Sequence, residues 1–385
     1  MKRPVFAPSR RFAISIIAST LGFACMFANP LTAHAQADAD TILIGQSVSL
    51  TGPYDEIGLG LKAGIEAHFE AVNQAGGING KKLKLVSLDD ASDPARAKAN
   101  VKKLIDDNVL ALIGLAGSHN INPLVAEITA AKVPLIAPST GDIGLRTPSN
   151  RYIFNTRASY VDEMRKVVST LIPRGLKKIA LFAQNDASGR AGLAGLAEAL
   201  DKYQLRMHLY GSADRNSVNV TSQAASIAAS KPDAVVIVAG GQTAAAFIKE
   251  MKRIGSSPKF TVASSAGAGT LARLLGSDGG GVEVSQIVPL PFSNSEPLGR
   301  EYLKRIGGEK AASFSSYEGY IAARILVEGM KKAGRVLTRE TLVDALDRAG
   351  TIDLSGFKVT YSPTNHVGTD FVELTVLGSN GTYKR

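Results

Sequence analysis

The sequence predicts an α/β protein whose sheets are mostly parallel and which is divided into two similar halves. Short apolar segments alternate with helical patterns along most of the chain, and many of them end in polar or glycine-rich turns. This alternation begins near residue 42 and begins again after residue 160. A chain of 385 residues is long enough for two domains of ordinary size. We therefore expect two lobes that face each other across a cleft.

The first unit of this pattern occupies residues 42–64. An apolar run at Ile42–Leu50 predicts a buried strand, and the Gly-Pro turn within Thr51–Glu56 ends it. Apolar residues then recur at helical spacing from Ile57 onward. Because ligands of open α/β sheets bind beyond the carboxyl ends of strands, we predict that Ser49–Glu56 forms one wall of a small-molecule site. An ordinary strand-to-helix turn is the alternative.

The remaining elements follow in order. The first half continues with a helix that Asp93 caps and Pro94 opens, and with another helix that begins at Asn122-Pro123. Strands are predicted at residues 83–88, 109–113, 134–137, 178–183, 205–210, 234–239, 260–263, 357–361 and 371–377. Helices of the later part are predicted at residues 161–171, 220–229, 243–254, 316–333 and 339–349.

The N-terminus predicts export from the cytoplasm. Basic residues precede an apolar stretch at 12–27, and Ala33-His34-Ala35 fits the small-x-small cleavage pattern. We expect a signal peptide over residues 1–35, cleaved after about Ala35, and a periplasmic location. Arg10-Arg11 leaves twin-arginine export open beside the general route. The single cysteine, Cys25, lies within this segment, so disulfides are not expected in the mature chain.

Few patterns indicate enzyme chemistry, and we expect no catalytic residues, metal site or cofactor. The chain has no HExxH pair, no GxSxG elbow and no cysteine nucleophile in its mature part. Gly58–Ala63 resembles a dinucleotide fingerprint, but it lies too far beyond its strand, so close helix packing explains these glycines better. The formal charge of +10 is spread over scattered basic doublets rather than a basic-aromatic run, so we do not expect nucleic-acid binding.

Loops rich in serine, threonine and glycine remain as candidates for a binding site. Ser118 and Ser139 follow two neighbouring predicted strands of the first half. Hydroxyls and backbone amides placed before helix N-termini bind carboxylates without any chemical reaction. Two such loops at one edge of a sheet therefore indicate a carboxylate site.

Several segments resemble signatures of one family, the type I periplasmic solute-binding proteins similar to leucine/isoleucine/valine-binding protein. The segments that carry this resemblance are Ser49–Tyr54, Gly76–Lys82, Asp89–Pro94, Ala111–Gly114 with Ser118, and Pro134–Ser139. The resemblance implies two Rossmann-like lobes joined by three crossovers, acting as a monomer that delivers a ligand to an ABC permease in the inner membrane. It places lobe 1 at residues 40–157 and 288–362, and lobe 2 at residues 158–287 and 363–385. A periplasmic ligand-sensing receptor on the same fold is the alternative function.

The resemblance also assigns site residues. It implies that Ser118 binds the ligand carboxylate, together with the loop Ser139-Thr140-Gly141. Ser188 and Gly240 stand where relatives have tyrosines, and Ser264 stands where amino-acid binders have the acid that pairs with the ligand ammonium. The predicted ligand-binding residues are Tyr54, Ile57, Ser118, His119, Ser139, Thr140, Gly141, Ser188, Gly240 and Ser264.

In the second half, the loops that match the ligand-binding loops of amino-acid binders contain no acidic residue. This absence bears on whether the ligand has an ammonium group. An ammonium buried without a counter-charge costs several kcal/mol. Asp186 is the one acid that the sequence places nearby. We therefore expect a small carboxylic acid without an α-ammonium group, of aromatic or extended shape. An ordinary branched-chain amino acid, paired with another residue, is the alternative.

Overall fold

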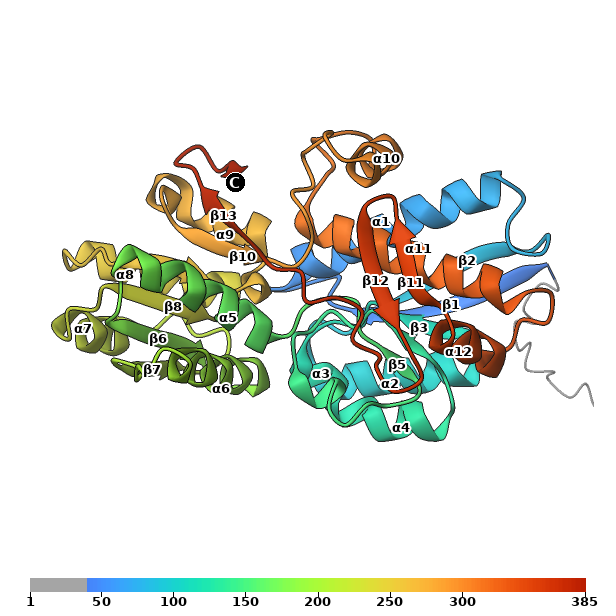
Figure 1. Cartoon of the computed structure of the whole chain (residues 1–385), viewed down its shortest axis with the longest axis horizontal. Coiled ribbons are helices and arrows are strands. Elements are labelled where there is room, and N and C mark those ends of the chain that lie inside the picture. Colours follow the sequence, from blue (N-terminus) through green and yellow to red (C-terminus); the bar gives the residue numbers. More distant parts are fainter. Residues whose placement is uncertain (1–39) are drawn as a thin grey trace, which may run out of the picture. The chain divides into compact units, whose positions relative to one another are not determined.

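The computed structural model describes residues 40–385, which form two lobes around separate sheets (Figure 1). The predicted signal peptide lies outside these residues. Helices cover both sheets, and most neighbouring strands are parallel, so the predicted α/β class is confirmed. No helix in the described part of the chain is long and apolar enough to cross a membrane.

Lobe 1 contains a fully parallel five-stranded sheet with the order β2-β1-β3-β4-β5. Its strands are β1 (Thr41–Val48), β2 (Lys82–Asp89), β3 (Ala111–Ile113), β4 (Leu135–Ile136) and β5 (Ile153–Phe154). Its helices are α1 (Asp55–Gln74), α2 (Pro94–Asp106), α3 (Ser118–Ile121), α4 (Val125–Ala130), α10 (Pro297–Ile306), α11 (Phe314–Ala333) and α12 (Arg339–Asp347). The antiparallel hairpin of β11 (Gly350–Leu354) and β12 (Phe357–Tyr361) packs beside α11.

Lobe 2 contains a seven-stranded sheet with the order β14-β13-β10-β9-β8-β6-β7, in which only the β10-β13 and β13-β14 pairs are antiparallel. Its strands are β6 (Ile179–Gln184), β7 (Tyr210–Ala213), β8 (Ala234–Val238), β9 (Lys259–Val262), β10 (Glu283–Gln286), β13 (Glu373–Leu377) and β14 (Tyr383–Lys384). Its helices are α5 (Tyr160–Leu171), α6 (Ala187–Asp201), α7 (Thr221–Ala229), α8 (Gly241–Arg253) and α9 (Ala268–Leu275).

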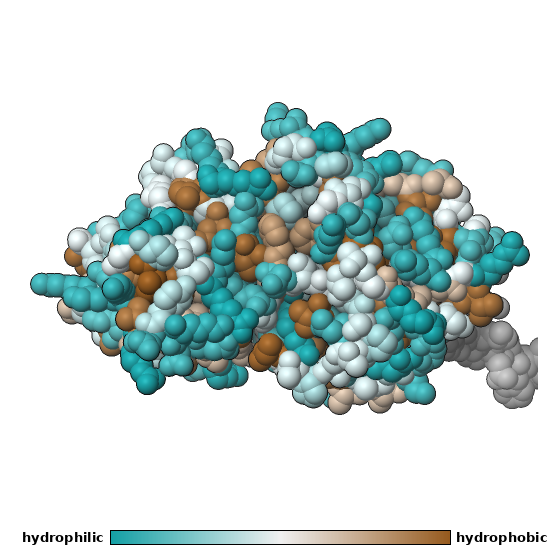
Figure 2. All heavy atoms as spheres, viewed as in Figure 1, coloured by the Kyte–Doolittle hydropathy of each residue, from teal (hydrophilic) through white to brown (hydrophobic). Residues whose placement is uncertain are grey.

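Three connections join the lobes: one after β5, one after β10 and one after β12. The expected three-crossover arrangement is therefore confirmed. Short 3-10 helices occur at Asn122–Leu124, Ile143–Leu145, Ile172–Arg174, Ser264–Ala266 and Gly276–Gly279. Hydrophilic side chains cover most of the face shown in Figure 2, and hydrophobic side chains appear there in small separate patches.

Helices α1 and α11 approach to backbone contact, and glycines make this possible. A Cβ atom at Gly64 would lie 1.8 Å from the carbonyl oxygen of Ser316, and one at Gly319 would lie 2.2 Å from that of Leu61. A Cβ at Gly58 would lie 1.9 Å from the carbonyl oxygen of Ser49. The prediction of close helix packing is confirmed for Gly60, whose Cβ would lie 2.6 Å from Cβ of Ser315 on α11, whereas Gly58 packs against the backbone that follows β1.

Local signals explain other helix starts. The side chain of Asp93 accepts a hydrogen bond from the Arg96 backbone amide at 2.8 Å, and Pro94 opens α2, as predicted. The strand predicted at residues 205–210 is wrong, because β7 begins only at Tyr210. Leu205 and Met207 instead pack against the lobe 2 core from a loop. Strand β10 was not predicted. Its buried Glu283 pairs with Arg174 at 2.6 Å.

Candidate ligand-binding site

A cleft lies between the lobes, where the carboxyl ends of strands from both sheets meet. Lobe 1 lines it with Ser139, which follows β4, and with Arg157, which follows β5. Lobe 2 lines it with Gly240 after β8, Ser264 after β9 and Ile287 after β10. The position agrees with the rule that ligands of open α/β sheets bind beyond the carboxyl ends of strands.

The structure brings most of the predicted site residues to this cleft. Those that line it are Tyr54, Ile57, His119, Ser139, Ser188, Gly240 and Ser264. Ser118, Thr140 and Gly141 do not line it. They lie directly behind its wall, and the Ser118 side chain is fully buried.

Hydroxyl groups of both lobes meet at Ser118. Its Oγ atom lies 2.6 Å from Oγ1 of Thr140 in lobe 1 and 3.2 Å from Oγ of Ser188 in lobe 2. Ser188 therefore covers Ser118 in this arrangement of the lobes. Behind them, the carbonyl oxygen of Gly141 accepts a hydrogen bond from the amide of Tyr160 at 2.8 Å, and a Cβ at Gly141 would clash with that residue.

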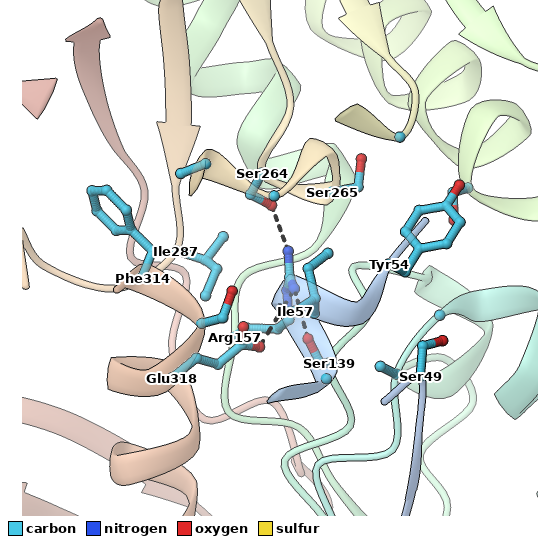
Figure 3. A pocket seen from close by; sticks show the side chains of 18 of the residues that line it. Ser49, Tyr54, Ile57, Ser139, Arg157, Ser264, Ser265, Ile287, Phe314 and Glu318 are labelled. Atoms are coloured by element: carbon cyan, nitrogen blue, oxygen red, sulfur yellow. Dashed lines mark hydrogen bonds and ion pairs between the residues drawn. The ribbon is translucent and has the colours of Figure 1, made fainter. Parts of the chain in front are cut away.

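Arg157, which is not among the predicted site residues, occupies the centre of the cleft (Figure 3). Its Nη1 atom donates to Oγ of Ser139 at 3.3 Å and lies 3.4 Å from Oε1 of Glu318. Its Nη2 atom donates to Oγ of Ser264 at 2.5 Å and lies 3.4 Å from Oε1 of Glu163. One guanidinium group thus joins side chains of both lobes.

Glu163 holds the lobe 2 side of this cluster in place. Its Oε2 atom accepts hydrogen bonds from the backbone amide of Ser264 at 2.9 Å and from the hydroxyl of Ser285. Its Oε1 atom accepts from the Ser264 hydroxyl at 2.8 Å. Glu163 is fully buried and does not line the cleft, so its carboxylate positions Ser264 and Arg157 rather than facing a ligand.

Glu318 is a second acid at the cleft, so the expectation that Asp186 is the one acid nearby is wrong. Burial raises the pKa of Glu318, while the positive charge of Arg157 opposes that rise. The residue lies on α11, far along the chain from the loops that the sequence reading considered. The available signal was a charged residue between Tyr317 and Gly319, on the buried side of a long helix.

One side of the cleft is apolar. Phe314 and Ile287 stand beside Arg157, and Ile57 approaches from α1 (Figure 3). Val238 of lobe 2 and Val288, in the connection after β10, add aliphatic surface. A ligand that fits here therefore has a hydrocarbon part to place against these side chains.

Tyr54 crosses the rim of the cleft from lobe 1 to lobe 2. Its hydroxyl lies 3.4 Å from Oε1 of Gln184, and a Cβ at Gly240 would lie 2.6 Å from it. Burial raises the pKa of Tyr54, so its hydroxyl stays protonated at neutral pH. Because Gly240 has no side chain, the Tyr54 ring has room to approach its backbone.

His119 lies at the same rim and is neutral at pH 7. Burial lowers its pKa to about 4, and the positive charge of Arg215 acts in the same direction. The Nε2 atom lies 3.0 Å from Oγ of Ser92. Neutral His119 can accept a hydrogen bond from this hydroxyl, and protonated His119 cannot.

This geometry predicts that ligand binding weakens as the pH falls. With a pKa of about 4 in the closed cleft and about 6.5 when exposed, His119 binds fewer protons in the closed form between these values. Lowering the pH from 7 to 5 should therefore favour opening and weaken affinity by about twentyfold. Calorimetric titrations at both pH values check this. His119→Asn should remove most of the difference, and an equal pH effect in the variant would contradict the assignment.

The described residues contain no cluster of three or more histidine, cysteine or acidic side chains that could hold a metal ion. The features that they do bring together are two α/β lobes, three connecting segments and a cleft at the strand ends of both sheets. This combination of fold and site defines a solute-binding protein.

Comparison with known proteins gives the family. Residues 41–382 match the family model described as periplasmic binding protein, so the chain belongs to the periplasmic binding protein family. The family consists of solute-binding proteins rather than enzymes.

Three relatives show how far the likeness extends. A Pseudomonas aeruginosa protein named amino acid binding protein is 26% identical over 313 residues, which are 79% of this chain and 81% of the relative. The structure of a possible leucine/isoleucine/valine-binding protein from Rhodopirellula baltica has a TM-score of 0.85 and 30% identity, covering 90% of this chain and 97% of that one. A substrate-binding periplasmic protein from Ralstonia solanacearum has a TM-score of 0.82 and 28% identity, covering 89% and 99%.

Proposed function

We propose that this protein binds a small carboxylate-bearing solute in the periplasm and delivers it, as a monomer, to an ABC importer. Binding occurs as the lobes close around the ligand, a hinge motion that the three connections permit. The family supports the binding function and the periplasmic location. The signal peptide expected over residues 1–35 supports export.

The hydrogen-bond donors around Arg157 are the observation that supports a carboxylate group on the ligand. The Nε–H group of Arg157 is buried and has no partner among the described residues, and the hydroxyl of Ser265, which follows Ser264 in the chain, is likewise unpartnered. Both residues line the cleft. A guanidinium group offers only donors, and charge-assisted bonds to a carboxylate are its strongest match. The neighbouring hydroxyl of Ser139 can donate to the same group.

The charges in the cleft bear on whether the ligand carries an ammonium group. Arg157 contacts Ser264, the position where the resemblance places the acid of amino-acid binders, so a cation already stands there. Both nearby carboxylates also contact Arg157. We therefore propose a carboxylic acid without an α-ammonium. Glu318 favours the second candidate, an α-amino acid, because its carboxylate reaches the cleft, and the name of the Pseudomonas relative agrees with that candidate.

Matched pairs of ligands separate these candidates. The protein is freed of bound compounds by unfolding and refolding, and calorimetry then compares 4-methylpentanoate with L-leucine, and 3-phenylpropanoate with L-phenylalanine. Each pair differs only in the ammonium group. Tighter binding of the acids by about tenfold or more is the expected result. Tighter binding of the amino acids, lost in Glu318→Gln, would establish the second candidate, and binding of none of the four would count against the proposed ligand class.

Ser118 provides a further prediction for the same site. Its hydroxyl contacts Ser188 of lobe 2, and a ligand carboxylate bound between the lobes would take the place of that contact. A hydrogen bond to a charged group contributes about 1.5–3 kcal/mol. Ser118→Ala should therefore weaken binding of the preferred acid by roughly ten- to hundredfold while the protein stays folded. Thr129→Ala on α4, away from the cleft, is the control. Unchanged affinity in Ser118→Ala would remove Ser118 from the site.

A further inference from the structure

We infer that Arg215 is a positioning residue that holds the cleft closed, by joining lobe 2 to Ser92 and Tyr54 of lobe 1. Arg215 lies in the loop between β7 and α7. Its Nη2 atom donates to the carbonyl oxygen of Ser92 at 3.0 Å and also contacts the Ser92 hydroxyl. Its guanidinium carbon lies 5.2 Å from the centre of the Tyr54 ring. We call these three side chains the rim contact.

The lobe 1 side of the rim contact is rigidly built. Ala91 and Ser92 both adopt positive φ angles, of 46° and 59°. Two carboxylates stabilise this turn, because Asp89 accepts from the Ala91 amide at 2.9 Å and Asp90 accepts from the Ser92 amide at 2.8 Å. Asp90 is itself buried and accepts from Ser47 at 3.0 Å. The Ser92 carbonyl is therefore presented in a fixed direction.

The lobe 2 side depends on closure. Among the described residues, the hydrogen bonds of the Arg215 guanidinium go to Ser92, and its buried Nε atom has no partner. When the lobes separate, these bonds and the approach to Tyr54 are lost together. The hydrogen bond from the charged Arg215 to the Ser92 carbonyl stabilises the closed form, and so does the position of this cation over the Tyr54 ring.

The rim contact also shapes the binding site. Tyr54 lines the cleft and contacts Gln184 and Gly240 of lobe 2. The Arg215 guanidinium lies over the Tyr54 ring. The Ser92 hydroxyl also lies within hydrogen-bond distance of Nε2 of His119, which lines the same rim. One arginine outside the cleft thus holds Ser92 and Tyr54 directly, and His119 through Ser92, in their closed positions. None of these contacts requires a ligand atom, so they favour closure in the ligand-free protein as well.

Interlobe distances test this inference directly. Spin labels are placed at exposed positions of the two lobes, by Lys98→Cys on α2 and Lys202→Cys at the end of α6, in the chain from Gln36 onward, which has no other cysteine. Double electron–electron resonance then compares ligand-free protein with Arg215, with Arg215→Ala and with Arg215→Lys. We expect Arg215→Ala to shift the population toward longer distances, and Arg215→Lys to restore part of the short-distance population because it keeps the charge. Arg206→Ala, which removes an exposed arginine of lobe 2, is the matched control.

Identical distance distributions for the parent and Arg215→Ala would overturn the inference. The inference rests on the proposed hinge function. The interlobe distances are measured without a ligand, so they test the inference even if the proposed ligand class is wrong. Where 4-methylpentanoate binds, stopped-flow measurements should show it leaving Arg215→Ala about ten- to hundredfold faster, with a smaller change in the association rate. Unchanged melting temperature separates this role from a general loss of structure.

Discussion

Arg157→Gln should lower the free energy of unfolding by about 3–5 kcal/mol, because it removes the cation from a buried cluster. Glu163 is fully buried, Glu318 nearly so, and both carboxylates contact the Arg157 guanidinium at 3.4 Å. Glutamine can keep one hydrogen bond to a serine but cannot balance two negative charges. Urea unfolding at pH 7 measures the loss.

A second variant separates lost charge balance from lost packing. Arg157→Gln combined with Glu318→Gln removes one cation and one anion, so it should recover a large part of the stability of Arg157→Gln alone. Arg165→Gln, whose salt bridges are on the surface, should cost about 1 kcal/mol or less. Stability of Arg157→Gln equal to that of the parent would show that the cluster is not held together by this ion pair.

Gly64→Ala should also destabilise the fold strongly, by about 3 kcal/mol. The new methyl group would lie 1.8 Å from the carbonyl oxygen of Ser316 and 2.7 Å from the amide nitrogen of Tyr320. Both are backbone atoms of α11, so no side-chain movement can relieve the overlap, and α1 and α11 must separate.

The control for this prediction is Gly280→Ala. A Cβ there would make only ordinary contacts, the nearest at 3.5 Å, and the residue has a negative φ of −55°. Its melting temperature should stay close to that of the parent. A loss of less than about 1 kcal/mol in Gly64→Ala would mean that the two helices do not pack at backbone distance.

Local sequence signals were sufficient for most of the fold. Alternating apolar and helical segments indicated parallel sheets, and the Asp93-Pro94 pair marked the start of α2, because both effects act between residues close in sequence. The polar loops after β3, β4, β8 and β9 were also predictable, since parallel strands end at one edge of their sheet. Seven of the ten predicted site residues line the cleft for this reason.

The charged residues of the cleft were not predictable in the same way. Arg157 contacts Glu318, which is 161 residues away in sequence, and Arg215 contacts Ser92, which is 123 residues away. Nothing in the neighbouring sequence of either residue indicates such a partner. Strand β10 was missed for a related reason, because its polar residues Glu283 and Gln286 are buried through distant partners, Arg174 and Thr375.

Native mass spectrometry tests the central claim, that the cleft takes up a carboxylate-bearing solute, most directly. The protein is purified without denaturation, and its bound compounds are released and identified. We predict a bound small carboxylic acid, and a lower occupancy in Ser118→Ala purified in the same way. Full occupancy by a compound without a carboxyl group, such as a neutral sugar or a nucleoside, would contradict the account.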